Sequence, residues 1–276
     1  MDGETRECVQ YYHRISAVTL VSTPYPVFLG IRFQQVGETE VACSLELLKQ
    51  LVGQLGRRFI NVLVADALYL QTPFVRAVES LDMEWVAALK NNQPALLAEA
   101  EYLSSRPAPV QWFDGKDDLS LWHLPAVEWP AAGRVVRVVK AVRAQKIKRV
   151  RIEKNGTHRE EKKEVVSVRS VNFYAAGVDL GSIPPELIRR LGRSRWTIDA
   201  AAFQTLTTDC HIKRPSVHSK DVALVVLTMI RVLAHNLMMV FFHRQIRSHC
   251  RNAPPTFCET AASLAPALST DGVDTS

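Results

Sequence analysis

Two short apolar runs, each followed by a helical segment, constrain the fold of this chain more than any other feature. Val62–Ala65 ends at Asp66 and precedes a helix expected over 72–81, and the run 83–90 precedes a helix expected over 93–105. Strands that alternate with helices in this way predict a sheet with parallel pairing and helices on its faces. We therefore expect an α/β fold in which Val62–Ala65 is a central, fully buried strand.

A hairpin and a helix are expected ahead of these runs. Residues 14–22 and 27–36 are rich in β-forming side chains and are separated by a proline-containing breaker, which predicts two strands joined by a turn. Residues 41–56 repeat leucine at helical spacing and end on a glycine that suits a helix stop. The expected sheet is therefore mixed, with antiparallel as well as parallel strands.

The character of the chain changes after residue 106. Residues 107–180 alternate apolar and basic side chains and contain Asn155-Gly156, a pair that favours a tight turn, so we expect a β-rich segment with a long basic hairpin. Residues 252–276 are small and polar, and we expect them to be disordered. Helices are expected again over 184–192, 196–206 and about 220–247.

Charge is distributed unevenly along the 276 residues, whose formal net charge is +6. Residues 1–133 hold 10 basic and 16 acidic residues (net −6), residues 134–169 hold 13 and 4 (net +9), and residues 185–251 hold 11 and 4 (net +7). An acidic first half joined to basic later segments indicates a polyanionic partner such as nucleic acid. The alternative is an ordinary solvated charged face.

Cysteine usage and one apolar stretch bear on where the chain works. The five cysteines form no CxxC pair, and their odd number and wide spacing indicate neither a disulfide framework nor a zinc site, so a reducing cytoplasm fits best. The apolar stretch 222–242 contains Arg231, His235 and Asn236 near its centre, where charge is costly in lipid. It therefore predicts a buried helix and no membrane partner.

Asp66 is the carboxylate placed best for function. It ends a strand and precedes a turn and a helix, and ligands of open α/β sheets bind beyond the carboxyl ends of such strands. Its oxygens would suit a divalent cation, whereas the alternative is an aspartate that only caps the turn. Lys90, at the end of the next strand, either faces a phosphate or is simply solvated.

Three segments resemble those that carry the catalytic carboxylates of bacterial DDE transposases, the insertion-sequence enzymes with an RNase H-like core. The string VADALYLQTPFVRAVESLDMEWVAALKNNQPALL, which begins at Val64, resembles their second-aspartate segment. The string RSRWTIDAAAFQTL, residues 193–206, is similar to the helix that presents their third carboxylate, and DGETRECVQYYHR, which begins at Asp2, to their first-aspartate segment. The resemblance covers about residues 2–245 and is to the insertion-sequence-4-like group, which carries a β-rich insertion.

The resemblance implies a fold and a division into domains. The fold is α/β: an RNase H-like mixed sheet flanked by helices, with the insertion between the last core strand and the helix of the third carboxylate. The implied parts are the first part of the core (1–106), the β-rich insertion with the basic hairpin (107–183), the C-terminal helices of the core (184–251) and the disordered tail (252–276).

Carried over residue by residue, the resemblance implies a catalytic site. The catalytic and metal-binding carboxylates fall on Asp2, Asp66 and Asp199, and Arg195, one helical turn before Asp199, is expected to contact DNA phosphate. The hairpin would lie against the DNA of the transposon ends. Its expected DNA-binding residues are Lys146, Lys148, Arg149 and Arg151.

Three carboxylates suit a two-metal phosphoryl transfer, in which two Mg²⁺ or Mn²⁺ ions activate the attacking oxygen and stabilise the leaving oxygen. The implied function is metal-dependent cleavage and transfer of DNA strands in cut-and-paste transposition. The implied partner is double-stranded DNA, both transposon ends and target, bound by a homodimer, and the implied location is the cytoplasm, in association with the nucleoid.

The sequence departs from the family pattern at three positions. Asp199 stands where the family usually has Glu, and Gly192 and Leu206 stand where related enzymes often carry Tyr and Lys. Because the first aspartate falls at Asp2, we expect an N-terminally truncated element or a late start codon. Two alternatives to an active transposase stay open: an inactive remnant that only binds DNA, and an RNase H-fold nuclease that hydrolyses without joining.

Overall fold

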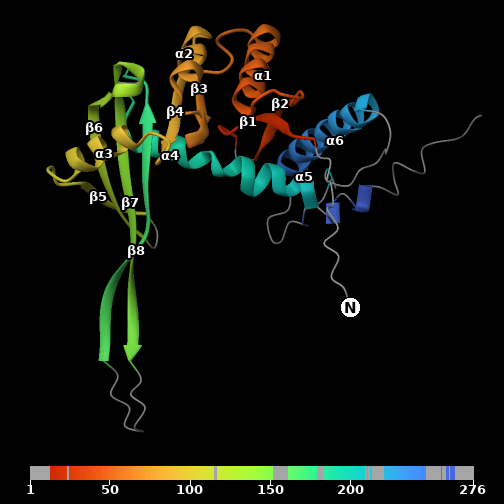
Figure 1. The fold of residues 1–276 in the computed structure, drawn as a ribbon. Coiled ribbons are helices and arrows are strands. Elements are labelled where there is room, and N and C mark those ends of the chain that lie inside the picture. Colours follow the sequence, from red (N-terminus) through yellow and green to blue (C-terminus); the bar gives the residue numbers. More distant parts are fainter. Residues whose placement is uncertain are drawn as a thin grey trace, which may run out of the picture. The chain divides into compact units, whose positions relative to one another are not determined.

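The computed structural model describes residues 13–23, 25–114, 117–151, 161–178, 183–208, 210, 212, 221–246, 256, 259–260 and 262–264 (Figure 1). The chain divides into two compact units, one formed by Met1–Gln54 with Trp196–Ser276 and the other by Leu55–Arg195. Each unit is described separately below.

The first unit contains a hairpin and a set of helices. Strands β1 (Ile15–Leu20) and β2 (Val27–Phe33) pair antiparallel, as the sequence predicts, and α1 (Glu40–Leu55) lies against β2. Gly30 permits this approach, because a Cβ atom there would stand 3.0 Å from Cδ2 of Leu51. The remaining elements of the unit are the π-helical segment η4 (Ile198–Phe203), α5 (Gln204–Thr208), α6 (Asp221–Phe241) and the π-helical segment η5 (Phe242–Ile246).

A small hydrophobic core joins the hairpin to these C-terminal helices. Phe28 of β2 packs with Ala202 of η4, Leu206 of α5 and Val232 of α6, and all four are buried. The side-chain amide of Asn236, on α6, makes the two backbone hydrogen bonds that a neighbouring strand would make. Its Oδ1 accepts from the N–H of Phe28 at 2.9 Å, and its Nδ2 donates to the carbonyl of Phe28 at 2.8 Å. The polar interruption of the apolar stretch therefore satisfies the backbone of β2.

Helix α6 corrects the sequence prediction of a buried helix. Val232, His235 and Met239 are buried, but the opposite side of the helix is exposed and equally apolar. The segment Val222–Ile246 is long and apolar enough to cross a membrane by length and composition, and 22% of its most apolar window is buried. The prediction was wrong for this side because apolar side chains continue around the helix, past the part that packs on β2. The exposed residues are Val222, Val226, Met229, Ile230, Leu233, Leu237 and Phe241.

The second unit is built on a six-stranded mixed sheet with the order β3-β4-β8-β7-β6-β5. Its strands are β3 (Val62–Ala65), β4 (Glu84–Leu89), β5 (Val110–Asp114), β6 (Asp117–Trp129), β7 (Arg134–Arg151) and β8 (Glu161–Ala176). Strands β3 and β4 are parallel, and all the other neighbours are antiparallel. Its helices are η1 (Ala67–Tyr69), α2 (Thr72–Ser80), α3 (Pro94–Ser104), η2 (Pro130–Ala132) and α4 (Pro185–Ser194).

The β-rich segment continues the sheet of β3 and β4. The last residues of β8 pair with β4, from Phe173 opposite Leu89 to Ala176 opposite Val86, while the same residues pair with β7 on their other side. The long basic hairpin expected from the sequence corresponds to β7 and β8. Its Asn155-Gly156 turn lies outside the described residues, as does most of the tail after residue 251.

Strand β3 occupies a different position from the one expected. Among the described residues it pairs with β4 alone, and all four of its residues are half-buried. The prediction of a central, fully buried strand was therefore wrong, whereas β4 is buried as expected. A continuous apolar run is compatible with either place, because composition does not fix the order of strands in a sheet.

Helices cover both faces of the sheet. On one face, Lys140 of β7 donates a hydrogen bond to Ser104 of α3 at 3.1 Å. On the other, Val139 and Ala141 pack in the core together with Ile188 of α4. Because successive residues of a strand point to opposite faces, α3 and α4 lie on opposite sides. The predicted α/β architecture, a mixed sheet flanked by helices, is confirmed.

Candidate metal and phosphate site

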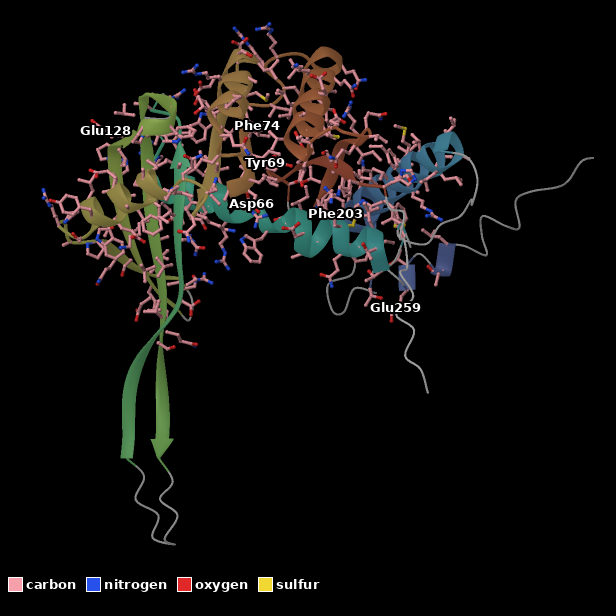
Figure 2. All side chains as sticks on the ribbon, in the orientation of Figure 1. Asp66, Tyr69, Phe74, Glu128, Phe203 and Glu259 are labelled. Atoms are coloured by element: carbon pink, nitrogen blue, oxygen red, sulfur yellow. The ribbon has the colours of Figure 1, made fainter. Side chains whose placement is uncertain are left out.

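Asp66 directly follows β3, at the carboxyl end of the parallel pair (Figure 2). Its Oδ1 accepts a hydrogen bond from the N–H of Ala67 at 2.7 Å and thereby caps η1. The side chain is 38% exposed, so the rest of the carboxylate can reach a ligand. The sequence left capping of the turn and ligand binding as alternatives for Asp66. The two are compatible, because the cap uses Oδ1 and Oδ2 can bind a ligand.

Two of the predicted cations flank this carboxylate. Nζ of Lys90 lies 3.6 Å from Oδ1 of Asp66, and Nη1 of Arg195 lies 3.7 Å from Oδ2. Lys90 arrives there because it follows β4, and the carboxyl ends of parallel strands meet at one edge. Arg195 arrives there because it ends α4, which packs across β3 and β4. The second unit thus brings together three residues that lie far apart in sequence.

A set of side-chain hydrogen bonds holds the loop that follows β3. Asn92 donates to the carbonyl of Ala67, and Gln93 donates to the carbonyl of Leu70 at 2.8 Å. The indole N–H of Trp129 donates to Gln93 Oε1 at 2.9 Å. Sequence reasoning missed these positioning residues; the signal was the run of three amide side chains, 91–93, directly after Lys90.

The other two predicted carboxylates fall in the first unit of the chain. Asp199 lies exposed in the π-helical segment η4 of the first unit. Segments of π-helix are rare and occur frequently at functional sites. Asp2 lies outside the described residues. The roles of both residues therefore stay predictions.

The predicted DNA-binding residues of the hairpin lie on β7. Lys146, Lys148, Arg149 and Arg151 pair through their backbones with residues of β8, and the structure describes no side chain at these positions. Their contact with DNA stays a prediction.

The donor chemistry at Asp66 suits a hard divalent cation, because a half-exposed carboxylate at a strand end offers the oxygen ligands that Mg²⁺ and Mn²⁺ prefer. Within the described part of the chain, no group of three or more His, Cys, Asp or Glu side chains is gathered for a metal. Asp66 therefore fits as one ligand of a site that needs others.

A mixed sheet with helices on both faces and a carboxylate beyond the end of a core strand defines an α/β protein of the RNase H-like type. The family described as "Transposase DDE domain" matches residues 8–237, most of the chain, and the chain belongs to that family. The predicted insertion-sequence DDE transposase class is thereby confirmed, and with it a transposase function; membership of the family implies DNA as the substrate and dependence on divalent metal. Asp66, Lys90, Arg195 and Asp199 all lie inside the matched range, and Asp2 lies before it. No curated protein matches the chain.

Proposed function

We propose that this chain is the catalytic region of a cut-and-paste transposase, which cleaves DNA strands and joins them to a target with two Mg²⁺ or Mn²⁺ ions. Asp66 would hold the metal together with Asp2 and Asp199. The observation that supports this proposal best is the position of Asp66 between Lys90 and Arg195.

Metal ions bound to these carboxylates would supply an activated water or 3′-hydroxyl and would stabilise the leaving oxygen. The protein's own part is to hold a carboxylate in a fixed place. The cap to Ala67 and the bonds from Asn92 and Gln93 do this, because they restrain the loop that carries Asp66. Placement matters, since an error of about 1 Å at a reacting centre can cost about 100-fold in rate.

The two flanking cations would orient a phosphate of the scissile strand. The side chain of Arg195 is only 15% exposed, so its guanidinium is already restrained before substrate binds. A planar, restrained guanidinium suits bidentate hydrogen bonding to phosphate. Lys90 is 65% exposed and would act as a mobile point charge.

The strands β7 and β8 would carry the path of the duplex away from Asp66. The basic side chains of the proposed path are Lys146, Lys148, Arg149 and Arg151, within a segment whose net charge is +9. We propose that both transposon ends and target bind as double-stranded DNA, with two copies of the chain in the complex.

Asp199 is the weakest part of the constellation, because its side chain is one methylene shorter than the Glu of the family. An inactive remnant that still binds DNA through Arg195 and the hairpin is the second candidate. The specific observation that favours it is that Asp199 stands where the family usually has Glu.

Nicking of supercoiled plasmid in Mn²⁺ separates the two candidates. We expect Asp66→Asn to lower the nicking rate by more than about 100-fold. The matched control is Asp82→Asn, because Asp82 is 62% exposed, pairs only with the equally exposed Arg57 among described residues, and has a φ of 60°, which Asn tolerates. The control should nick at the wild-type rate.

Equal nicking by the wild type and Asp66→Asn would overturn the metal-site proposal. No nicking by the wild type together with retained DNA binding would support the remnant. Asp199→Glu is expected to raise the rate if ligand length is the defect, and an unchanged rate would exclude ligand length as the cause.

A further inference from the structure

A polar hollow lies on the face of the second unit that α4 covers. It is lined by strand residues and by two arginines of the helix: Leu119, Ala141, Arg143, Ser170, Asn172, Tyr174, Arg189 and Arg193. Three of these eight residues carry a guanidinium group, three carry neutral hydrogen-bonding groups, and none is acidic. Such a lining is chemically suited to an anion with several oxygen acceptors.

The register of the sheet explains why these groups share one face. Arg143 of β7 stands opposite Ser170 of β8, and Ala141 stands opposite Asn172. Residues directly opposite each other in an antiparallel pair point to the same side of the sheet. This side therefore carries the polar side chains of Arg143, Ser170 and Asn172 around the small side chain of Ala141. The hollow forms above Ala141, because its side chain is a single methyl group, whereas Val139 and Arg143, its neighbours on the same face of β7, are larger.

The guanidinium groups are held in place by their neighbours. Arg189 is buried to 7% exposure and donates to Glu186 at 2.7 and 3.2 Å, and Nε of Arg143 lies 3.3 Å from Asp117. Arg193 lies one helical turn after Arg189 on the same side of α4 and is exposed. Arg189 and Arg143 are therefore held in place by carboxylates that offset much of their charge, and Arg193 is the cation of the hollow that is exposed to solvent.

Tyr174 lines the hollow and its ring lies against α4. Burial raises the pKa of its hydroxyl, and the positive charges of Arg193, Arg189 and Arg195 oppose that rise. Arg195 follows Arg193 by two residues at the end of α4 and lies beside Asp66, so the hollow and the carboxylate share this end of the helix.

We propose that a phosphodiester of the DNA backbone binds at the open rim of the hollow between α4 and the strands β7 and β8, through Arg193 and Asn172, with Tyr174, Arg143 and Arg189 behind them. The inference rests on the proposed DNA substrate and adds a second phosphate contact, next to the one at Arg195. A strand anchored at two points along α4 would have a fixed direction as it reaches Asp66.

DNA binding by the full chain, measured by fluorescence anisotropy on a labelled duplex in EDTA at a series of chloride concentrations, tests this inference without any catalysis. Loss of one phosphate contact lowers the slope of log K against log salt by about 0.9. We expect Arg193→Gln to show this change and about tenfold weaker binding. The matched control is Arg190→Gln, which removes the same charge from the same helix outside the hollow.

Asn172→Asp is a second variant that keeps the fold, since the new carboxylate would face arginines. It is expected to unfold at the wild-type temperature or above and to bind DNA at least about tenfold more weakly. Equal losses in Arg193→Gln and Arg190→Gln, or wild-type binding by Asn172→Asp, would overturn the inference.

Inorganic phosphate, added at the same ionic strength as the chloride buffer, tests whether the hollow binds free phosphate and not a phosphodiester of DNA. Stabilisation by free phosphate that Asn172→Asp abolishes, with unchanged DNA binding, would assign the hollow to free phosphate and overturn the DNA contact. The nicking assay is an independent test. If the wild type and Asp66→Asn nick equally while Arg193→Gln changes the salt slope of DNA binding, the catalytic proposal is overturned and this inference stands.

Discussion

The ring of Tyr174, on β8, lies directly against the backbone of Gly192, on α4. A Cβ atom at position 192 would overlap Cδ1 and Cε1 of the ring, so only glycine lets the helix approach the sheet this closely. Gly192 stands where related transposases often carry a tyrosine, and here an aromatic ring reaches the same turn of the helix from a strand. This contact determines how closely α4 packs on the sheet, and it therefore also determines the positions of Arg189, Arg193 and Arg195.

Gly192→Ala is therefore expected to destabilise the protein by about 2–3 kcal/mol, because the helix or the ring must move to admit the methyl group. Gly53→Ala is the matched control: no atom lies within 4 Å of its added Cβ, and alanine favours a helix interior. The control should gain about 0.5–1 kcal/mol. Chemical denaturation measures both, and equal effects at the two glycines would contradict the packing argument.

The ion pair between Arg134 and Glu79 is expected to contribute to stability in a pH-dependent way. Arg134 donates to Glu79 at 2.8 and 2.7 Å, and these bonds, with one from Trp85, hold the pKa of the Glu79 carboxyl below its ordinary 4.5. A lowered pKa means that the stabilisation is present above pH 4.5 and is lost as the pH falls through the folded-state value. Arg134→Met should cost about 1 kcal/mol at neutral pH, since both side chains are about one-third exposed, and less in acid.

Arg57→Met provides the comparison, because Arg57 and Asp82 form a pair at 3.0 Å in which both side chains are more than 60% exposed. Its loss should cost less than about 0.5 kcal/mol. Denaturant midpoints at neutral pH and at about pH 3 would show the difference, and a cost for Arg134→Met that persists undiminished in acid would argue against the assignment to Glu79.

Asn236→Leu tests the amide that pairs with β2. The change leaves the N–H and the carbonyl of Phe28 without their partner, which costs about 1–3 kcal/mol. The neighbouring Leu237 is 64% exposed, so Leu237→Ala should change stability by less than about 0.5 kcal/mol. Thermal unfolding distinguishes them, and a larger loss in Leu237→Ala would mean that the exposed side of α6 carries the stability instead.

Lys90→Gln is predicted to act in opposite directions on two ligands. Lys90 lies 3.6 Å from Oδ1 of Asp66, and a unit charge at about 4 Å is worth about 1 kcal/mol in water. Removing it should tighten Mn²⁺ binding about fivefold, because the metal no longer competes with the ammonium group, and should weaken DNA binding. Paramagnetic titration with Mn²⁺ and anisotropy with DNA measure the two constants. If both weakened together, Lys90 would have only a structural role.

The sequence predicted the elements that depend on local pattern. The hairpin of β1 and β2, helix α1 and strand β4 follow from periodicity and turn residues, and Asp66 follows from its place at a strand end. The convergence of Lys90 and Arg195 on Asp66 could not be derived from spacing alone, because Lys90 is 24 residues and Arg195 129 residues further along the chain. It depends on how α4 crosses the sheet.

Other features were hidden because they depend on pairing over long distances. Nothing local in β8 shows that Phe173 to Ala176 will pair with β4 as well as β7. The hollow beside Asn172 could not be predicted, because its arginines come from β7 and α4, which lie in two separate basic segments of the sequence. Net charge alone does not show that these segments meet. The outer side of α6 was misread because apolar composition alone does not show which part of a helix is covered.

The double pairing of β8 has a mechanical consequence. Strand pairing connects β7 through β8 to β4 and on to β3, with one register shift in the β7–β8 ladder between Arg143 and Ala144, so the hairpin belongs to the same sheet as the strand that precedes Asp66. A pull on the hairpin along its strands loads these hydrogen bonds in shear. Tension in a duplex held by the hairpin would therefore be transmitted through the sheet to the strand that precedes Asp66, the proposed metal ligand.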